Sequence, residues 1–372
     1  MIEDKISLRE KLAHFNVLML LLISCLAIIG FVMLFDAADQ NLQPWAQPQI
    51  FRFLIGLCIM TAIALSPVHW WMKYAYALYI LSLVALILVE LMGHIGMGAQ
   101  RWLNLYFFKI QPSEGMRISL ILALACYFHR QSLDEIRKLR TLVLPLLMIF
   151  IPTALILRQP DLGTAIMLVG SGILVLFLAG VKMRYFVISA CSAIISFPII
   201  WTFLRDYQKN RILTFLDPER DPFGAGYHIL QSKIALGSGG IWGKGFSHGT
   251  QSHLNFLPEK QTDFIFTMFA EEFGFMGAIV VIGLFAVLIG LGIFLSLRCH
   301  STFTRLVSIG IIGTLFLYVF INMAMVMGLL PVVGVPLPLI SYGGTAMLTL
   351  LVGFGFFLNM DVHRHVRLKR YY

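Results

Sequence analysis

Ten apolar runs, most of them long enough to cross a bilayer, dominate this chain and leave little choice of fold. Backbone N–H and C=O groups inside lipid must be bonded within the chain, so such runs span the membrane as helices. Hydrophobic residues make up 59% of the sequence and charged residues only 13%, against roughly 45–50% and 25% in soluble domains. The runs cover residues 15–35, 51–66, 74–92, 115–128, 141–157, 162–180, 183–204, 264–297, 306–330 and 343–360. We predict an all-α integral membrane protein, a bundle of about ten transmembrane helices forming one domain over residues 1–372.

Two of these runs have uncertain boundaries. The fourth, residues 115–128, is too short to span unless its helix begins in the polar residues before it. The eighth, residues 264–297, is long and carries Glu271 and Glu272 in its first turns. We therefore expect the fourth helix to start earlier and the eighth to start above the bilayer.

Lysine and arginine are distributed unevenly between the two sides of the predicted bundle. With the N-terminus inside, sixteen lie in inner segments and five in short outer segments, and seven more lie in one long outer loop, residues 205–262, between helices seven and eight. Cytoplasmic loops carry the excess of basic residues. We expect a multi-pass protein of the cytoplasmic (inner) membrane with both termini in the cytoplasm. The net charge of +9 then belongs to a basic inner face against anionic lipid, and nucleic acid is excluded as a partner.

Polar residues gather in the outer segments. They lie at 96–114, 158–161, 205–262 and 331–344, and could meet at one outward-facing cavity. A long loop in a chain with short connections is usually functional. Within it, residues 226–236 predict a helix lying on the membrane surface. The glycine-rich residues 237–245 do not match a nucleotide-binding P-loop; they indicate a turn, although Lys244 there could meet a pyrophosphate.

Ionisable residues at helix starts are the candidates for chemistry. Asp263 lies where the long loop meets the eighth helix, and Glu114, Arg117 and Asp161 lie near the outer starts of helices four and six. Ionisable groups at membrane depth are costly and usually face a cavity or a partner. Helix capping is the alternative for Glu114 and Asp161, which follow Gln-Pro pairs, and Glu114 and Arg117 could pair across one turn.

Asp263 also has a possible metal role. If the eighth helix starts early enough, Asp263, Thr267 and Glu271 share one face. Asp263 with Glu271 could then bind a divalent cation such as Mg²⁺. Glu271 could instead pair structurally with Lys260 or Arg101.

Several motifs in this order resemble the SEDS family of peptidoglycan glycosyltransferases over nearly the whole chain. They are GAQRWLNL from residue 98, QPSE from residue 111, QPDLGTA from residue 159, residues 231–277, and GVPLPLISYGG from residue 334. The resemblance implies ten transmembrane helices and polymerisation of lipid II into glycan strands at the outer face of the cytoplasmic membrane. It favours the elongation branch of the family over the division branch. It also implies a class B penicillin-binding protein transpeptidase and other elongation-complex membrane proteins as partners.

The resemblance also assigns residues. It implies that Asp263 is the essential catalytic residue. It also implies that Glu114, Arg101 and Trp102 bind substrate. The full candidate binding set is Arg101, Trp102, Glu114, Arg117, Asp161, Lys244, Gln251, Glu259, Lys260 and Ser341. Arg117 departs from the family, which commonly has lysine there. The planar guanidinium makes proton transfer at this position doubtful but keeps phosphate or carboxylate pairing.

The chemistry of such a reaction needs one base. A sugar hydroxyl attacks the anomeric carbon of a donor whose leaving group is a lipid pyrophosphate, so Asp263 alone could act as general base in an inverting displacement. Arg101, Arg117, Lys244 or a bound Mg²⁺ could stabilise the departing charge. Two other classes remain open, a lipid-linked precursor flippase and a membrane scaffold without chemistry.

Overall fold

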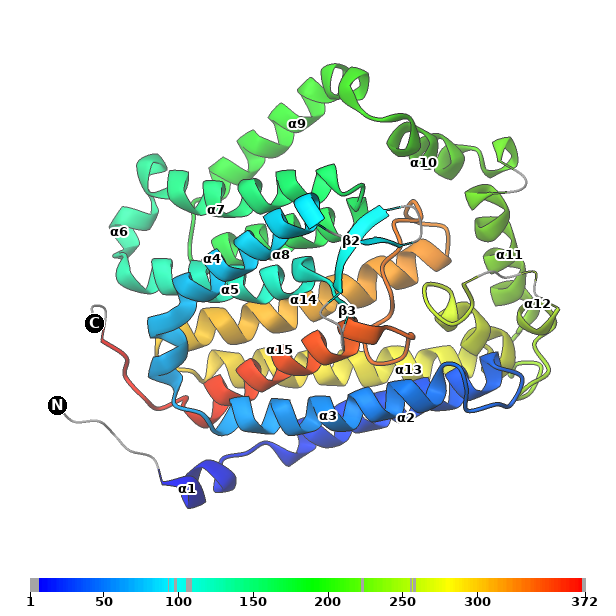
Figure 1. Cartoon of the computed structure of the whole chain (residues 1–372), viewed down its shortest axis with the longest axis horizontal. Coiled ribbons are helices and arrows are strands. Elements are labelled where there is room, and N and C mark those ends of the chain that lie inside the picture. Colours follow the sequence, from blue (N-terminus) through cyan, green and yellow to red (C-terminus); the bar gives the residue numbers. More distant parts are fainter. Residues whose placement is uncertain are drawn as a thin grey trace.

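The computed structural model describes residues 7–92, 94–96, 99–104, 109–221, 224–254, 256 and 259–369. Long helices run side by side and form most of the molecule (Figure 1). Each of the ten predicted spans is a helix in the structure: α2 (Val17–Ala37), α3 (Ala46–Leu65), α4 (Val68–Met92), α5 (Pro112–Arg130), α7 (Leu139–Arg158), α8 (Leu162–Leu178), α9 (Met183–Phe203), α13 (Ile265–Leu297), α14 (Thr302–Val326) and α15 (Gly344–Val362). Eight of these are long and apolar enough to cross a membrane. The predicted fold class is confirmed.

Shorter elements join these helices. They are α1 (Leu8–Ala13), α6 (Leu133–Ile136), α10 (Asp206–Leu216), the 3₁₀ helix η1 (Pro218–Arg220), α11 (Ala225–Ser238) and α12 (Thr250–His253). Three short antiparallel strands also form, in the order β1 (His94–Gly96), β2 (Ala99–Asn104) and β3 (Lys109–Ile110). The sequence analysis did not predict these strands, which lie in one of the polar outer segments.

Helix α5 is the buried centre of the bundle. It contacts α4, α7, α8, α14 and α15, and sixteen of its nineteen residues are buried. Its helix begins at Pro112, in the polar residues before the apolar run, as predicted. Because protein surrounds it, α5 can carry Glu114 and Arg117, which a lipid-facing helix could not bury cheaply.

Helix α13 is broken at Gly274. This residue has φ 67° and ψ −166°, outside helical geometry, in a region that disfavours side chains. A Cβ at Gly274 would collide with backbone atoms of residues 241–243. The backbone of the glycine-rich turn occupies this space. Phe275 N donates to Gly240 O at 2.9 Å, and Met276 N donates to Ile241 O at 3.1 Å. The uncertain eighth run is therefore a short outer helical segment and a long span.

Helix α11 runs across the ends of the bundle helices (Figure 1). It contacts α13 and α14, and Ile229, Ser232 and Ala235 are buried. The predicted helix of the long loop is present. Its buried side packs on protein, whereas we had expected a helix lying on lipid.

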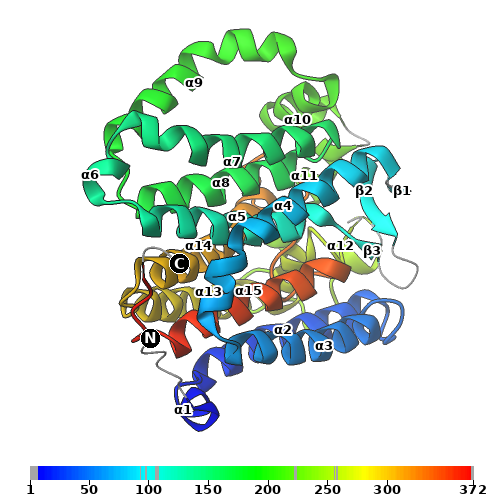
Figure 2. The same cartoon turned by 60° about the vertical axis from the view of Figure 1, so that its left-hand side comes forward.

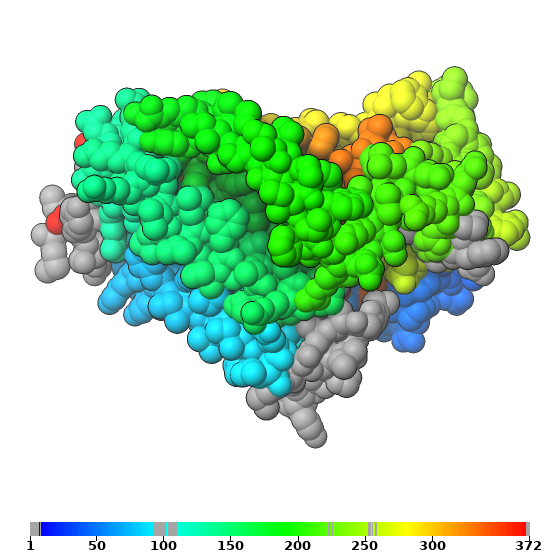
Figure 3. All heavy atoms as spheres, turned by 90° about the horizontal axis from the view of Figure 1, so that it is seen from above, coloured from blue at the N-terminus to red at the C-terminus, as the bar shows by residue number. Residues whose placement is uncertain are grey.

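Helix α9 stands apart from the bundle in Figure 2. None of its residues is buried, and side chains such as Ile194, Ile195 and Phe203 are strongly exposed. Figure 3 shows a hollow in the surface beside the ridge that α9 and α10 form. In a membrane protein, such an apolar helix contacts lipid over most of its surface.

The proline loop, residues 331–343, connects α14 to α15 and packs on α2 through Gly30. A Cβ at Gly30 would lie 2.7 Å from Ile340 Cα and 2.8 Å from Leu339 O. Leu339 itself has φ 67°, a strained conformation for a side-chain-bearing residue that its surroundings must hold in place.

Replacing Gly30 with alanine tests this packing. We expect Gly30→Ala to lower the thermal unfolding midpoint in detergent, because overpacking costs about 1–3 kcal/mol. The control is Gly290→Ala on α13, where a Cβ meets nothing within 4 Å. The control should be neutral or slightly stabilising, because alanine favours helix. Equal effects of the two substitutions would contradict the close approach at Gly30.

Candidate functional site

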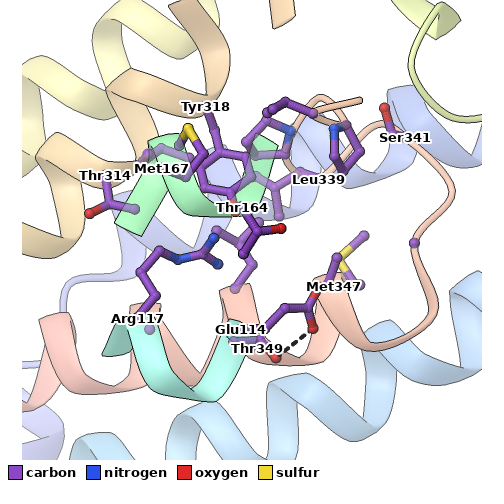
Figure 4. A pocket seen from close by; sticks show the side chains of 18 of the residues that line it. Glu114, Arg117, Thr164, Met167, Thr314, Tyr318, Leu339, Ser341, Met347 and Thr349 are labelled. Carbon is purple, nitrogen blue, oxygen red and sulfur yellow. Dashed lines mark hydrogen bonds between the residues drawn. The ribbon is translucent and has the colours of Figure 1, made fainter. Parts of the chain in front are cut away.

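A pocket lies between α5, α8, α14, α15 and the proline loop, with about 940 Å³ of empty space when the solvent open to it is included. Its walls are mostly apolar, and a few polar side chains point into it (Figure 4). These polar residues are Glu114, Arg117, Thr164, Thr314, Tyr318, Ser341 and Thr349. A concave apolar site with few convergent polar groups is typical of ligand binding.

Arg117 places a buried cation in this cavity. The side chain is 8% exposed, and its Cζ lies 4.4 Å from the centre of the Tyr318 ring. Its Nη1 has no hydrogen-bond partner. The buried guanidinium therefore keeps an unused N–H donor, and leaving a buried donor without a hydrogen bond is costly, so the group is suited to an anionic ligand.

Glu114 lies one turn before Arg117 on α5. Its Oε2 accepts a hydrogen bond from Thr349 Oγ1 of α15 at 3.2 Å. Glu114 bonds to Thr349 and Arg117 stacks on Tyr318, and the two opposite charges, one helical turn apart, also attract each other. Both still face the same cavity (Figure 4).

Asp263 lies at the edge of the cavity, in the turn just before α13. A Cβ at Gly334, which lines the cavity, would be 3.6 Å from Asp263 Oδ2. The Asp263 carbonyl accepts a hydrogen bond from Asn322 Nδ2 of α14 at 3.0 Å. Its carboxylate lies beside Gly334 of the proline loop.

The proline loop and the segment before α13 are bound together. Asn322 Nδ2 also donates to Val335 O at 2.7 Å. Ser341 Oγ donates to Thr262 O at 2.6 Å, and Tyr342 N donates to Gln261 O at 2.8 Å. Ser341 was among the predicted site residues, and it acts here by fixing the backbone beside Asp263. Asn322 was missed, although a single amide inside an apolar helix is a signal that could have found it.

Burial and neighbouring charges shift the pKa of Asp263. Burial, and then the Glu259 carboxylate, raise its pKa to about 6, while Arg211 of α10 acts in the opposite direction. Glu259 is exposed, and its Oε2 accepts a hydrogen bond from Thr262 Oγ1 at 3.1 Å. Arg211 was missed because nothing in the sequence distinguishes it from the other basic residues of the long loop.

Glu271 is bound to Lys244. Lys244 Nζ lies 2.7 Å from Glu271 Oε1, which also accepts from Thr250 Oγ1 and Gln251 N. The helix begins at Ile265, so Asp263 is not on the helical face that we had considered. Across the described chain, no three His, Cys, Asp or Glu residues are grouped to hold a metal. Glu271 is thus in a structural ion pair, but its partner is Lys244, whereas we had expected Lys260 or Arg101.

Asp161 has a capping role. Its Oδ1 accepts from Thr164 N at 3.1 Å at the start of α8. Its Oδ2 accepts from Gln111 Nε2 at 3.2 Å. The capping alternative is correct for Asp161, and the same carboxylate links the two Gln-Pro segments.

The remaining candidates are not among the residues that line the cavity. Trp102 is half-buried in β2, and Gln251 lies in α12. Lys260 is buried three residues before Asp263. Arg101 belongs to β2, but its side chain lies outside the described residues.

Comparison with known proteins shows which family has this architecture. The family model described as "Cell cycle protein", which covers FtsW, RodA and SpoVE, matches residues 12–366. The chain belongs to this family. It is 43% identical over 357 residues to the peptidoglycan glycosyltransferase MrdB of Escherichia coli (strain K12), with 96% of each chain covered. It is 36% identical to the probable peptidoglycan glycosyltransferase FtsW of Trichlorobacter lovleyi, with 94% of each chain covered.

Solved structures agree with this assignment. A chain of a peptidoglycan synthase complex, described as coordinating polymerization and crosslinking, superimposes with a TM-score of 0.83 at 29% identity, covering 94% of this chain and 98% of that one. The rod shape determining protein RodA of Thermus thermophilus superimposes with a TM-score of 0.72 at 26% identity, covering 95% and 98%. The FtsW/RodA/SpoVE fold is therefore shared over nearly the whole length.

The Lys244–Glu271 contact generates a stability prediction. Lys244→Met leaves a fully buried carboxylate without its cation, which costs about 3–5 kcal/mol. We expect a lower thermal unfolding midpoint and faster proteolysis in residues 237–254. The double variant Lys244→Met/Glu271→Gln should recover much of the loss, because the uncompensated charge is gone. A double variant no more stable than Lys244→Met would contradict a structural ion pair.

Proposed function

We propose that this chain polymerises lipid II into peptidoglycan glycan strands, with Asp263 as the general base. Peptidoglycan glycosyltransferase activity follows from its family and from the 43% identity to MrdB over 96% of both chains. The observation that carries the assignment of Asp263 is its place at the edge of a cavity that holds Arg117, a buried cation with an unused donor. Base and cation are then available to one bound substrate.

The reaction needs one proton acceptor and one stabilised leaving group. The acceptor hydroxyl forms a bond to the anomeric carbon of the donor while the bond to the lipid pyrophosphate breaks. Asp263 takes the hydroxyl proton, a step worth about 10²–10⁴-fold in rate. Arg117 faces the charge that develops on the pyrophosphate. A single displacement of this kind inverts the configuration at that carbon.

The leaving group explains why one carboxylate is enough. Hydrolysis of a glycosidic bond uses a pair of carboxylates because an alkoxide must be protonated as it leaves. A pyrophosphate leaves as an anion and needs cations in place of an acid. Arg117 suits this role because a guanidinium stays charged and presents several donors in a fixed plane.

A divalent cation such as Mg²⁺ remains a prediction from the sequence. Glu271, one of its two proposed ligands, is engaged by Lys244. The carboxylates of Asp263 and Glu114 that face the cavity are the groups that could still contact such an ion. The mechanism above places every step on residues of the chain.

The arrangement of the ends supports the proposed orientation. Helix α1 and the described residues after α15 lie at one end of the bundle, and α11, α12 and the start of α13 lie at the other (Figure 1). A multi-pass protein with basic termini in the cytoplasm would present Asp263 at the outer face of the inner membrane, where lipid II is polymerised.

A transpeptidase partner is also proposed. The neighbour with a TM-score of 0.83 comes from a complex whose description couples polymerization to crosslinking. A class B penicillin-binding protein, together with elongation-complex membrane proteins, fits that pairing. The higher identity to MrdB than to FtsW favours elongation over division.

Asp263→Asn tests the general base. In a polymerisation assay with purified protein, transpeptidase partner and lipid II, we expect a loss of about 10²–10⁴-fold in glycan strand formation. Asp217→Asn, an exposed acid of the same loop, serves as the control and should retain full activity. Equal strand output from wild type and Asp263→Asn would remove the proposal. Loss of labelled-lipid transfer across the bilayer with polymerisation intact would favour the flippase alternative.

The charges around Asp263 generate a pH prediction. A base with a pKa near 6 is ionised above that pH, so activity should rise as pH increases through about 6. Glu259→Gln removes a like charge and should shift the acid limb of the pH–rate profile to lower pH. Arg211→Gln removes an opposite charge and should shift the limb upward. Shifts in the same direction for both variants would show that Asp263 does not set this limb.

A further inference from the structure

Three imidazoles gather at the end of the bundle away from Asp263. They come from three separate segments: His14 follows α1, His300 lies between α13 and α14, and His365 lies in the tail after α15. The ring centroids of His300 and His365 are 5.3 Å apart, and those of His14 and His365 are 6.4 Å apart. Chemistry at the outer face uses none of these residues.

Two arginines make this cluster cationic. A surface hollow with about 790 Å³ of open space is lined by Leu297, Arg298, Cys299, His300, Arg364 and His365. Among the described residues, Asp361 is the acid in direct contact with these arginines, with its Oδ1 3.3 Å from Arg364 Nη1. The Glu10 carboxylate is used by the α1 cap, where it accepts from Ser7 N at 2.8 Å. Protonated imidazoles would therefore add to an excess of positive charge.

An apolar surface borders the cations. Leu297, the last residue of α13, is 62% exposed, and Phe294 one turn earlier is 52% exposed. Arg298 Cζ lies 4.1 Å from the centre of the Phe294 ring. Here α13 and α15 end and α14 begins, which places the hollow at the level of lipid headgroups. Cations beside exposed apolar side chains match a ligand with a charged head and a hydrocarbon chain.

We propose that Arg298, His300, Arg364 and His365 form a proton-linked site for the phosphate of an anionic phospholipid, whose acyl chain lies along Phe294 and Leu297. The protein backbone at this site is partly fixed, because His300 N donates to Arg364 O at 3.0 Å. The site joins the tail to the α13–α14 link, and His14 extends it to α1. It is independent of the glycosyltransferase assignment.

Protons and lipid should bind together at this site. Partial burial, and then the charges of Arg364, His300 and His14, lower the pKa of His365, and Asp361 opposes this shift. A bound phosphate favours the imidazolium form and raises that pKa. Affinity is therefore highest below the pKa of the free site and falls as pH rises through the pKa of the lipid-bound site.

The experiment uses the full-length protein in detergent with phosphatidylglycerol as the probe. Native mass spectrometry counts bound lipid, and the thermal unfolding midpoint is measured with and without it at pH 6 and pH 8. For wild type, we expect binding at pH 8 to be weaker by at most about tenfold, the limit that a pKa change of about one unit sets. In His300→Gln/His365→Gln this pH dependence should disappear, and Arg298→Gln should weaken binding at both pH values.

Matched controls separate the explanations. Arg184→Gln removes an exposed arginine near the start of α9 and should bind lipid as wild type does. Comparing lipids within each variant cancels any general loss of stability. Equal effects of phosphatidylglycerol and phosphatidylcholine would overturn the proposal. Inorganic phosphate as effective as the lipid would overturn the lipid source, and an unchanged pH dependence in the double histidine variant would overturn the proton linkage.

Discussion

The position of Asp263 depends on one buried amide. Asn322 Nδ2 donates both to Asp263 O and to Val335 O, so α14 holds the start of α13 and the proline loop at once. Hydrogen bonds inside a membrane bundle have no water to replace them, which makes their loss expensive. Ser341 adds a second link through Thr262. The carboxylate and the cavity wall beside it are therefore fixed relative to each other by backbone contacts.

Arg117 adds a positive charge to the cavity that Asp263 adjoins. It lies on α5, the helix most enclosed by protein, and the Tyr318 ring of α14 supports its guanidinium. Cation–π contacts are worth about 2 kcal/mol when they are desolvated. This support explains how an arginine can occupy a mostly apolar cavity. The planar group rests on an aromatic surface and keeps its charge in the cavity.

Much of the fold could be predicted because lipid imposes a simple rule on the sequence. Runs such as residues 183–204 and 306–330 became α9 and α14 within a few residues, since backbone bonding leaves helix as the solution. The break at Gly274 could not be predicted. It depends on a turn thirty residues earlier that packs against it, and hydropathy contains no information about such contacts.

The residues of the site could be predicted from the sequence, but the partners of their side chains could not. Asp263, Glu114, Arg117 and Ser341 were named from residue type and from the family resemblance, and Glu114, Arg117 and Ser341 line the cavity that Asp263 adjoins. The partner of Glu271 proved to be Lys244, because the glycine-rich turn folds back onto α13. Arg211 reaches the environment of Asp263 from α10. Long-loop contacts of this sort depend on three-dimensional folding that spacing along the chain does not encode.

The interruption of α13 at Gly274 separates two functions of one helix. Its outer part follows directly from Asp263, and its longer part crosses the bilayer and exposes side chains such as Val280 and Val287. At the joint, Phe275 N and Met276 N bond to Gly240 and Ile241 of the glycine-rich turn, which ties the start of the spanning part to the long loop. Because the chain turns there, the direction of the part that crosses the bilayer does not set the direction of the part beside Asp263.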